Sequence, residues 1–426
     1  MSYILIILCL VCCLAIIKTN GQTRLLIFLC AIALFPFGLI LSGKFGAHRL
    51  LIIAFTLSVL IHNRSRRCIA TIPLKWILLV VFISHLLTGI FDGRVGPIVG
   101  SVKALNAYMI TFWLIVLGYV SCENIGEKTD RRILSVFASL SIIIGLYSIF
   151  CFVVGKDYYS QMIGDATDSM VDGRMRCAGF FFNSHVAGLA TSIYLLVLLY
   201  LKYKYRFTWK QNMGAILLFV ALFLTMSRSS LLDFIAGAFV FYVCALKNTP
   251  HKLKMILGGG FVLLFLYVVV GDVVMGPFSD AFEEDGGETG GSNVVMRLWQ
   301  LDLSLYYFNL SPIFGNGFSY FWEYIKANQA YGFDMLLGAE SYIFILLIER
   351  GAIQIVTICI CFILLIRYFI KHKTVESYLG LALVTAFLVN AIVTGCADKW
   401  PFVMPLIGYY MRYVQLQKNE KSICSR

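Results

Sequence analysis

Apolar residues in this chain gather in long runs that short polar segments separate. A membrane-spanning helix needs about 20 apolar residues, and thirteen runs approach that length. The runs are Tyr3–Ile17, Leu25–Leu41, Leu50–Ile61, Trp76–Ile90, Ala104–Val120, Ile133–Val154, Gly179–Leu201, Met213–Leu224, Leu231–Leu246, Met255–Val270, Ala352–Ile370, Tyr378–Thr394 and Phe402–Tyr413. The pattern predicts an all-α polytopic membrane protein with about 12–13 transmembrane helices, forming a single integral membrane domain over residues 1–426.

The composition supports this class and excludes a soluble enzyme with one large core. Hydrophobic residues make up 60% of the 426 residues and charged residues only 14%. A net charge of +12 would indicate nucleic-acid binding in a soluble protein. Here it indicates basic cytoplasmic loops, so no nucleic-acid partner is expected. The 13 cysteines lie mostly in apolar runs without metal-ligand spacing, which predicts neither a disulfide framework nor a zinc site.

Basic residues concentrate in alternate loops and so predict the orientation of the chain. They follow the third, seventh, ninth and eleventh runs, and include Arg64, Arg66, Arg67, Lys202, Lys204, Arg206, Lys247, Lys252, Lys371 and Lys373. These loops are then cytoplasmic. The opposite face receives residues 155–178, the polar break at Arg228 and a long stretch over residues 271–350. The N-terminus would lie outside, unless one short run is not a span.

The polar break is Thr225-Met226-Ser227-Arg228, between two apolar runs. An arginine at this position is costly unless it faces water, protein or an anion. A guanidinium group binds phosphate oxygens with two parallel hydrogen bonds, so Arg228 could hold a phosphate-bearing lipid. The alternative is a short turn whose arginine extends to the lipid headgroups.

The stretch over residues 271–350 begins with an acidic, glycine-rich segment at 283–292, which favours a solvated loop over a metal site. An amphipathic helix is predicted after Asn293, with Leu298 and Leu305 on one face and Arg297 on the other. A second helix is predicted over Ala339–Ile348. One face of the membrane then collects several arginines and one carboxylate, which indicates an anionic substrate and acid–base chemistry: Arg174, Arg176, Arg228, Arg297 and Glu340.

Four elements between roughly residues 172 and 355 resemble the motifs of a known family. They are Arg174 to Gly188, Thr225-Met226-Ser227-Arg228, Arg297 and Trp299 with Ser311–Gly317, and Glu340-Ser341-Tyr342 with Glu349-Arg350-Gly351. In this order they are similar to the motifs of the O-antigen polymerase and ligase superfamily. The gap from Arg297 to Trp299 is narrower than in the family pattern.

The resemblance implies a glycosyltransferase of the bacterial inner membrane that needs no metal or cofactor and inverts the sugar linkage. Its donor would be an undecaprenyl-pyrophosphate-linked oligosaccharide, bound at a periplasmic site that includes the large loop over residues 271–350. A chain-length regulator and a flippase would be possible partners in the same membrane. Family arginines hold the pyrophosphate, which implies this role for Arg228 and Arg297, and for Arg174 or Arg176.

The other departure, at Glu340 and Ser341, bears on the reaction. Ligases carry histidine where this chain has Glu340, followed by asparagine where it has Ser341, and this favours a repeat-unit polymerase over a ligase. A lipid-linked glycan flippase is the alternative of another class, and the near absence of charge within the spans argues against it.

The catalytic candidates are therefore Arg228, Arg297 and Glu340. Glu340 would be the general base, unless it only caps a helix. His185 is the alternative base, or else a polar residue buried between helices. Aromatic residues of the loop could stack on sugars or form an interfacial belt. The predicted substrate-binding residues are Arg174, Arg176, Asn183, His185, Ser227, Trp299, Ser341 and Tyr342.

Overall fold

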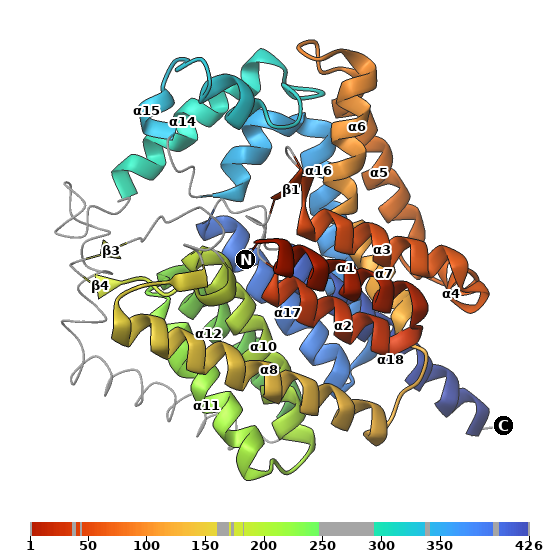
Figure 1. The fold of residues 1–426 in the computed structure, drawn as a ribbon. Helices are drawn as coiled ribbons and strands as arrows, with labels where there is room; N and C mark the ends of the chain where they lie inside the picture. Colours follow the sequence, from red (N-terminus) through yellow and green to blue (C-terminus); the bar gives the residue numbers. More distant parts are fainter. Residues whose placement is uncertain are drawn as a thin grey trace.

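A computed structural model describes residues 2–35, 40–42, 45–159, 170–171, 174–181, 183–246, 294–336, 341–394 and 400–424. In this part of the chain, helices account for the architecture, and the strands form two small hairpins (Figure 1). The predicted all-α polytopic membrane fold is confirmed.

The first half of the chain is a series of mostly short helices. They are α1 (Ser2–Lys18), α2 (Gly21–Leu34), α3 (Ala47–Ile61), α4 (Asn63–Ile69), α5 (Lys75–Ile90), α6 (Gly96–Met109), α7 (Trp113–Ser121) and the long α8 (Glu127–Val154). One hairpin, β1 (Ile40–Ser42) with β2 (Phe45–Gly46), precedes α3, and a second, β3 (Met170–Val171) with β4 (Arg174–Met175), follows α8.

The second half contains the longest helix, α16. After the 3₁₀ turn η1 (Gly179–Phe181) come α10 (Ser184–Lys204), α11 (Trp209–Leu224), α12 (Arg228–Ala245), α14 (Val294–Leu310), the π-helical turn η3 (Phe321–Ile325), α15 (Phe333–Leu336), α16 (Tyr342–His372), α17 (Val375–Val393) and α18 (Trp400–Cys424). Capping boxes begin two of these helices: Thr208 with Gln211 at α11, and Thr374 with Ser377 at α17.

Every predicted apolar run within the described residues contains a helix, and only Met255–Val270 lies outside them. Six described helices are long and apolar enough to cross a membrane, and five shorter ones are apolar. The run Leu25–Leu41 gives a shorter helix than predicted. Helix α2 ends at Leu34, because Pro36 disfavours helical geometry in the residue before it, and the end of the run enters β1.

Helix α10 lies at the centre of the bundle. It packs against α8, α11, α12 and α17, and 89% of its most apolar stretch is buried. Elsewhere glycines allow close crossings, as is usual for membrane helices. A Cβ atom at Gly118 of α7 would overlap the Pro405 carbonyl of α18, and one at Gly408 would overlap the Ile115 carbonyl. The central position of α10 fixes the residues at its N-terminus, which belong to the candidate site.

The helix ends gather into two sets that follow the alternation predicted from charge. At one end Lys204, the last residue of α10, forms ion pairs of 2.7 Å with Asp130 at the start of α8 and Glu376 at the start of α17. Tyr413, in the middle of α18, also donates to Asp130. This is the end at which the sequence concentrates Lys and Arg. The start of α10 and the start of α12 lie at the other end.

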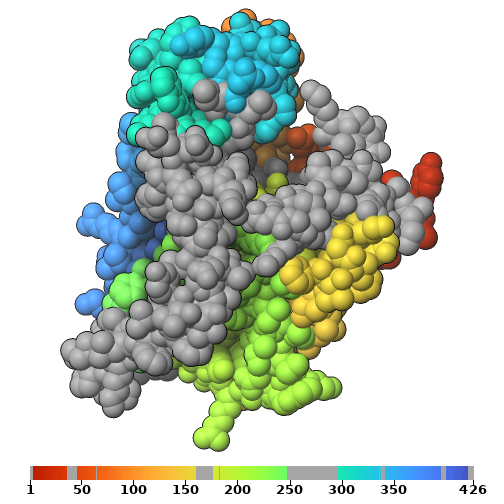
Figure 2. Space-filling model, turned by 90° about the vertical axis from the view of Figure 1, so that its left-hand side faces the viewer, coloured from red at the N-terminus to blue at the C-terminus, as the bar shows by residue number. Residues whose placement is uncertain are grey.

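The residues from α14 to α15 form a cap at this second end, beside the turn between α5 and α6 (Figures 1 and 2). The predicted amphipathic helix is confirmed as α14. Its Leu298 and Leu305 are exposed, whereas Gln300 and Ser304 are buried together with Leu303 and Tyr307, so an apolar stripe faces away from the protein while the buried side is mixed. This orientation suits a helix that lies against lipid.

The predicted second helix differs from the structure at its start and is confirmed at its end. Helix α16 begins at Tyr342 instead of Ala339, because Ser341 has an extended backbone conformation. Gly351 has a non-helical backbone, with φ of 66°, and a second helical segment continues from there to His372, so the predicted break at Glu349-Arg350-Gly351 is present. Few residues other than glycine adopt this backbone conformation, and Gly315 of the cap packs directly against it. Asn316 Nδ2 then donates to the carbonyl oxygens of Tyr307 (2.7 Å) and Ile348 (2.8 Å), which fastens the cap to α16.

Candidate functional site

The break between α11 and α12 is a tight, strained turn. Met226 has a φ of 49°, in the left-handed region that favours glycine. Its N–H group donates to the Phe223 carbonyl (3.0 Å), and Thr225 Oγ1 donates to the Leu222 carbonyl (2.7 Å). Strained backbone of this kind is concentrated at functional sites. The predicted helix break, with backbone groups bonded by small hydroxyl side chains, is therefore confirmed.

Serine hydroxyl groups cluster directly beyond this turn. Ser230 Oγ donates to Ser227 Oγ (2.8 Å), and Ser229 Oγ lies 3.1 Å from Ser227 Oγ. Ser192 of α10 donates to the Ser230 carbonyl (2.7 Å), and the lack of a side chain at Gly188 lets α10 approach the cluster. All these serines are buried. The cluster therefore joins the starts of α10 and α12 through polar contacts.

The segment before α10 lies against the same turn. Cys177 N donates to the Leu224 carbonyl (3.0 Å), and Arg176 Nη2 donates to the Met226 carbonyl (3.3 Å). His185 Nδ1 lies 3.4 Å from Ser227 Oγ. The structure thus brings together two motif elements that are about 50 residues apart in the chain, and four of the predicted site residues with them: Arg176, His185, Ser227 and Arg228.

Arg228 is the first residue of α12 and is partly buried. Ser227 occupies the N-cap position without a side-chain capping bond in the described structure. The N-terminus of a helix carries a positive partial charge, which adds to that of the arginine and favours an anion. Asn183 has a structural role, because its side chain caps α10 by accepting from His185 N (2.8 Å).

Ser341 and Tyr342, which are also predicted site residues, lie at the start of α16. Ser341 Oγ caps the helix by accepting from Ile343 N (3.2 Å). Tyr342 N donates to the Thr394 carbonyl at the end of α17 (3.2 Å), and the Tyr342 ring packs edge-on against Trp400 at 5.6 Å. The Tyr342 side chain is buried, so its packing accounts for an aromatic residue at this position without a role in stacking on a sugar.

Residues 213–356 match the family described as O-antigen ligase. This stretch belongs to the O-antigen polymerase and ligase superfamily. It contains the turn at Met226, helix α14 and the start of α16. No curated protein matches the chain.

The remaining superfamily positions lie on separate elements. Arg297 and Trp299 are on α14, where Arg297 is partly buried and the Trp299 side chain is 56% exposed. Arg174 lies in β4, where its backbone pairs with Val171. Glu340 lies outside the described residues, so its role as a base stays a prediction.

The superfamily glycines of the cap have a structural role that sequence reasoning missed. Gly317 packs against the buried carboxylate of Asp92, which forms a 2.9 Å ion pair with Arg94. Arg94 Nε also donates to the Asn316 carbonyl (3.2 Å). Gly317 N donates to the Glu349 carbonyl (3.0 Å). These contacts anchor the cap. The Asp92-x-Arg94 pair, which stands between two apolar runs, could have indicated this anchoring from the sequence.

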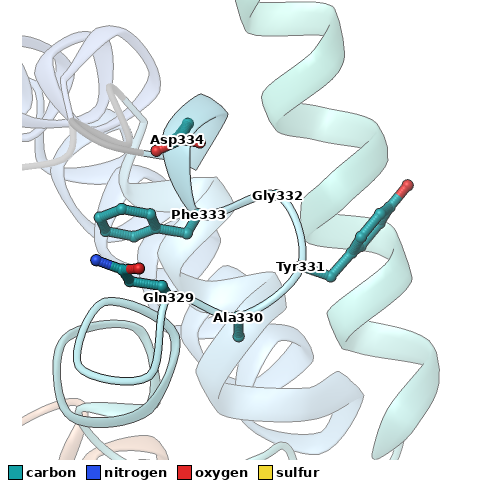
Figure 3. Close-up of a pocket in the computed structure, with 6 residues that line it drawn as sticks. All are labelled: Gln329, Ala330, Tyr331, Gly332, Phe333 and Asp334. Carbon is teal, nitrogen blue, oxygen red and sulfur yellow. The ribbon is translucent and has the colours of Figure 1, made fainter.

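A pocket of about 450 Å³ lies in the cap, lined by residues 329–334 (Figure 3). In Figure 3 the Tyr331 side chain points away from Phe333 and Asp334. Tyr307 OH donates to the Tyr331 carbonyl (2.7 Å), which ties this loop to α14. The pocket contains none of the predicted site residues, so it does not define the reaction centre.

Sequence reasoning also missed Asp233, a fully buried carboxylate five residues after Arg228. Asn390 Nδ2 of α17 donates to its Oδ2 (2.5 Å). An acidic residue inside the apolar run Leu231–Leu246 was a usable signal, because ionisable residues in spans are commonly functional. Asp233 is therefore an exception to the expectation that the spans carry almost no charge.

Proposed function

We propose that the protein is a surface-polysaccharide polymerase that joins undecaprenyl-pyrophosphate-linked oligosaccharide repeat units. The turn at Ser227 and Arg228 carries the proposal. It presents an arginine at a helix N-terminus beside Arg176, His185 and a hydroxyl cluster, within a stretch that belongs to the superfamily. This is the chemistry expected around a pyrophosphate group.

The arginine charge would stabilise the pyrophosphate as it leaves the anomeric carbon, a role that needs a fixed, partly desolvated cation. The acceptor sugar hydroxyl must lose a proton as it attacks. Glu340 is the proposed base, and His185 is the second candidate. A base positioned in this way contributes about 10²–10⁴-fold to the rate. Arg297 is proposed as a second pyrophosphate ligand, supplied by α14.

O-antigen ligation to a different acceptor is the second candidate function, because the matching family carries that description. The two reactions share a donor and a leaving group and differ in the acceptor. A polymerase transfers the growing chain to another lipid-linked repeat unit. The presence of Glu340 and Ser341, in place of the ligase His-Asn pair, supports polymerisation.

The surface glycan of a strain that lacks this protein separates the two functions. If the protein is a polymerase, surface molecules should carry a single repeat unit, and the long-chain ladder should return with the wild-type gene. A deletion strain with no repeat unit attached would instead identify a ligase. An unchanged ladder would contradict both functions.

We further propose that the protein lies in the bacterial inner membrane with the cap on the periplasmic side. A cysteine introduced at Lys326 of the cap should react with a membrane-impermeant thiol reagent in cells whose outer barrier has been opened. One introduced at Lys210, in the first turn of α11, should react only after lysis. Both lysine side chains are exposed, so the two introduced cysteines should be equally accessible from their own side of the membrane. Peptide mass spectrometry distinguishes the introduced cysteines from the native ones. The reverse pattern would contradict the orientation.

A further inference from the structure

We propose that Asp233 and Asn390 are positioning residues, which hold the start of α12 in register with the start of α16. Arg228 begins the first of these helices, and Ser341 and Tyr342 begin the second. The proposal rests on the proposed function for its consequence in catalysis, and on the contacts below for the positioning itself.

The pair is buried inside the bundle. Asp233 is 0% exposed and Asn390 2%. A carboxylate at this depth is costly, so a hydrogen-bonded partner is needed. Helices α12 and α17 also approach closely on this face. One turn beyond Asp233, a Cβ atom at Gly237 would lie 3.2 Å from the Ala382 carbonyl. The pair therefore fixes the register of two closely packed helices.

From Asn390 a continuous chain of hydrogen bonds reaches the start of α16. Thr394 Oγ1 donates to Asn390 Oδ1 (3.0 Å), and Thr394 N donates to the Asn390 carbonyl (2.7 Å). The Thr394 carbonyl accepts from Tyr342 N (3.2 Å). One turn of α17 away, the Ala391 carbonyl accepts from Ser341 Oγ (3.5 Å). A shift of Asn390 would therefore move the backbone of Ser341 and Tyr342.

Asp233 is connected to Arg228 by the first turns of helix α12. Five residues correspond to roughly 7.5 Å along the axis. Ser230, between them, is held by Ser227 and by Ser192 of α10. The helix therefore transmits the position of Asp233 to Arg228 with little freedom. The two halves of the proposed site, at α12 and at α16, meet through the Asp233–Asn390 bond.

The test exchanges the two side chains in the full-length protein. Three variants are compared with the wild type: Asp233→Asn, Asn390→Asp and the double variant. Asn390→Asp places two carboxylates together in a buried position. The double variant restores one carboxylate and one amide, with donor and acceptor exchanged, and it keeps an acceptor for Thr394 Oγ1.

Two quantities are measured for each variant. The first is hydrogen exchange of the amide groups at Tyr342 and Ile343, with the helical segment Leu114–Gly118 of α7 as a control. The second is glycan transfer from a lipid-linked repeat unit. Asn390→Asp should accelerate exchange at Tyr342 but not in α7. It should also slow transfer about 100-fold, as expected for a misplacement of about 1 Å. The double variant should restore both.

Unchanged exchange at Tyr342 in Asn390→Asp would overturn the positioning role, as would a double variant that fails to restore it. Restored exchange without restored transfer would also overturn it, because Asp233 would then act on the substrate directly. The exchange measurement does not depend on activity. If the wild type transfers no glycan, the proposed function fails while the positioning test still stands.

Discussion

Replacement of Arg228 by lysine is expected to reduce glycan polymerisation nearly as much as replacement by alanine. Lysine keeps the positive charge, but its ammonium group cannot present two parallel N–H groups to a pyrophosphate. Loss of one such donor to a developing negative charge typically costs about 10²–10³-fold in rate. The measurement is the glycan ladder and the initial transfer rate, normalised to the amount of folded protein in the membrane.

A matched control comes from an arginine at the opposite end of the bundle. Arg132 of α8 is exposed, and Arg132→Lys should leave the ladder unchanged. Arg228→Lys separates the two interpretations of the turn. An arginine that only extends to lipid headgroups would tolerate lysine, because both side chains reach the membrane interface. Normal long chains in a well-expressed Arg228→Lys variant would therefore remove Arg228 from the site.

Replacement of Glu340 by glutamine is expected to lower the transfer rate by about 10²–10⁴-fold, the range that general-base catalysis contributes. Glutamine keeps the size and hydrogen-bonding capacity of glutamate but cannot accept the proton. Binding of the lipid-linked donor should persist, because the arginines are unchanged. Transfer rate and donor affinity, measured on the same purified protein, separate these effects.

Glu340→Asp and His185→Gln are the informative companions. Ser341 already caps α16, so the alternative for Glu340 is a charge interaction with the helix N-terminus; aspartate keeps that charge with a shorter reach, so such an interaction would tolerate it and a base would not. His185 contacts Ser227 within the turn. Near-normal polymerisation by Glu340→Gln would contradict the assignment of Glu340, and loss of activity in His185→Gln would then identify the histidine as the base.

The positions of the helices could be predicted because their cause is local. Apolar runs define the buried or lipid-facing segments, and the break at Met226 follows from Thr225, Ser227 and Arg228 in the chain itself. The starts of α10 and α16 are also set locally, by the capping side chains of Asn183 and Ser341, although neither start was predicted at these residues.

Other features depend on contacts between distant residues, which a single sequence does not contain. Asp233 and Asn390 are 157 residues apart. The break at Gly351 was predicted from the Glu349-Arg350-Gly351 element, but its close contact with Gly315 of the cap was not. Amphipathicity predicted α14, but not that Gln300 and Ser304 would be buried together with Leu303 and Tyr307 while Leu298 and Leu305 stay exposed.

Reaction of the purified protein with a synthetic undecaprenyl-pyrophosphate-linked repeat unit tests the central claim most directly. The donor would be supplied as the sole glycan substrate, and products would be resolved by size, with Arg228→Ala as the inactive control. The account predicts lipid-linked products that grow by one repeat unit at a time, with release of one undecaprenyl pyrophosphate for each unit joined. Donor that remains unextended by active, folded protein, or that reacts only when a different acceptor is added, would contradict polymerisation.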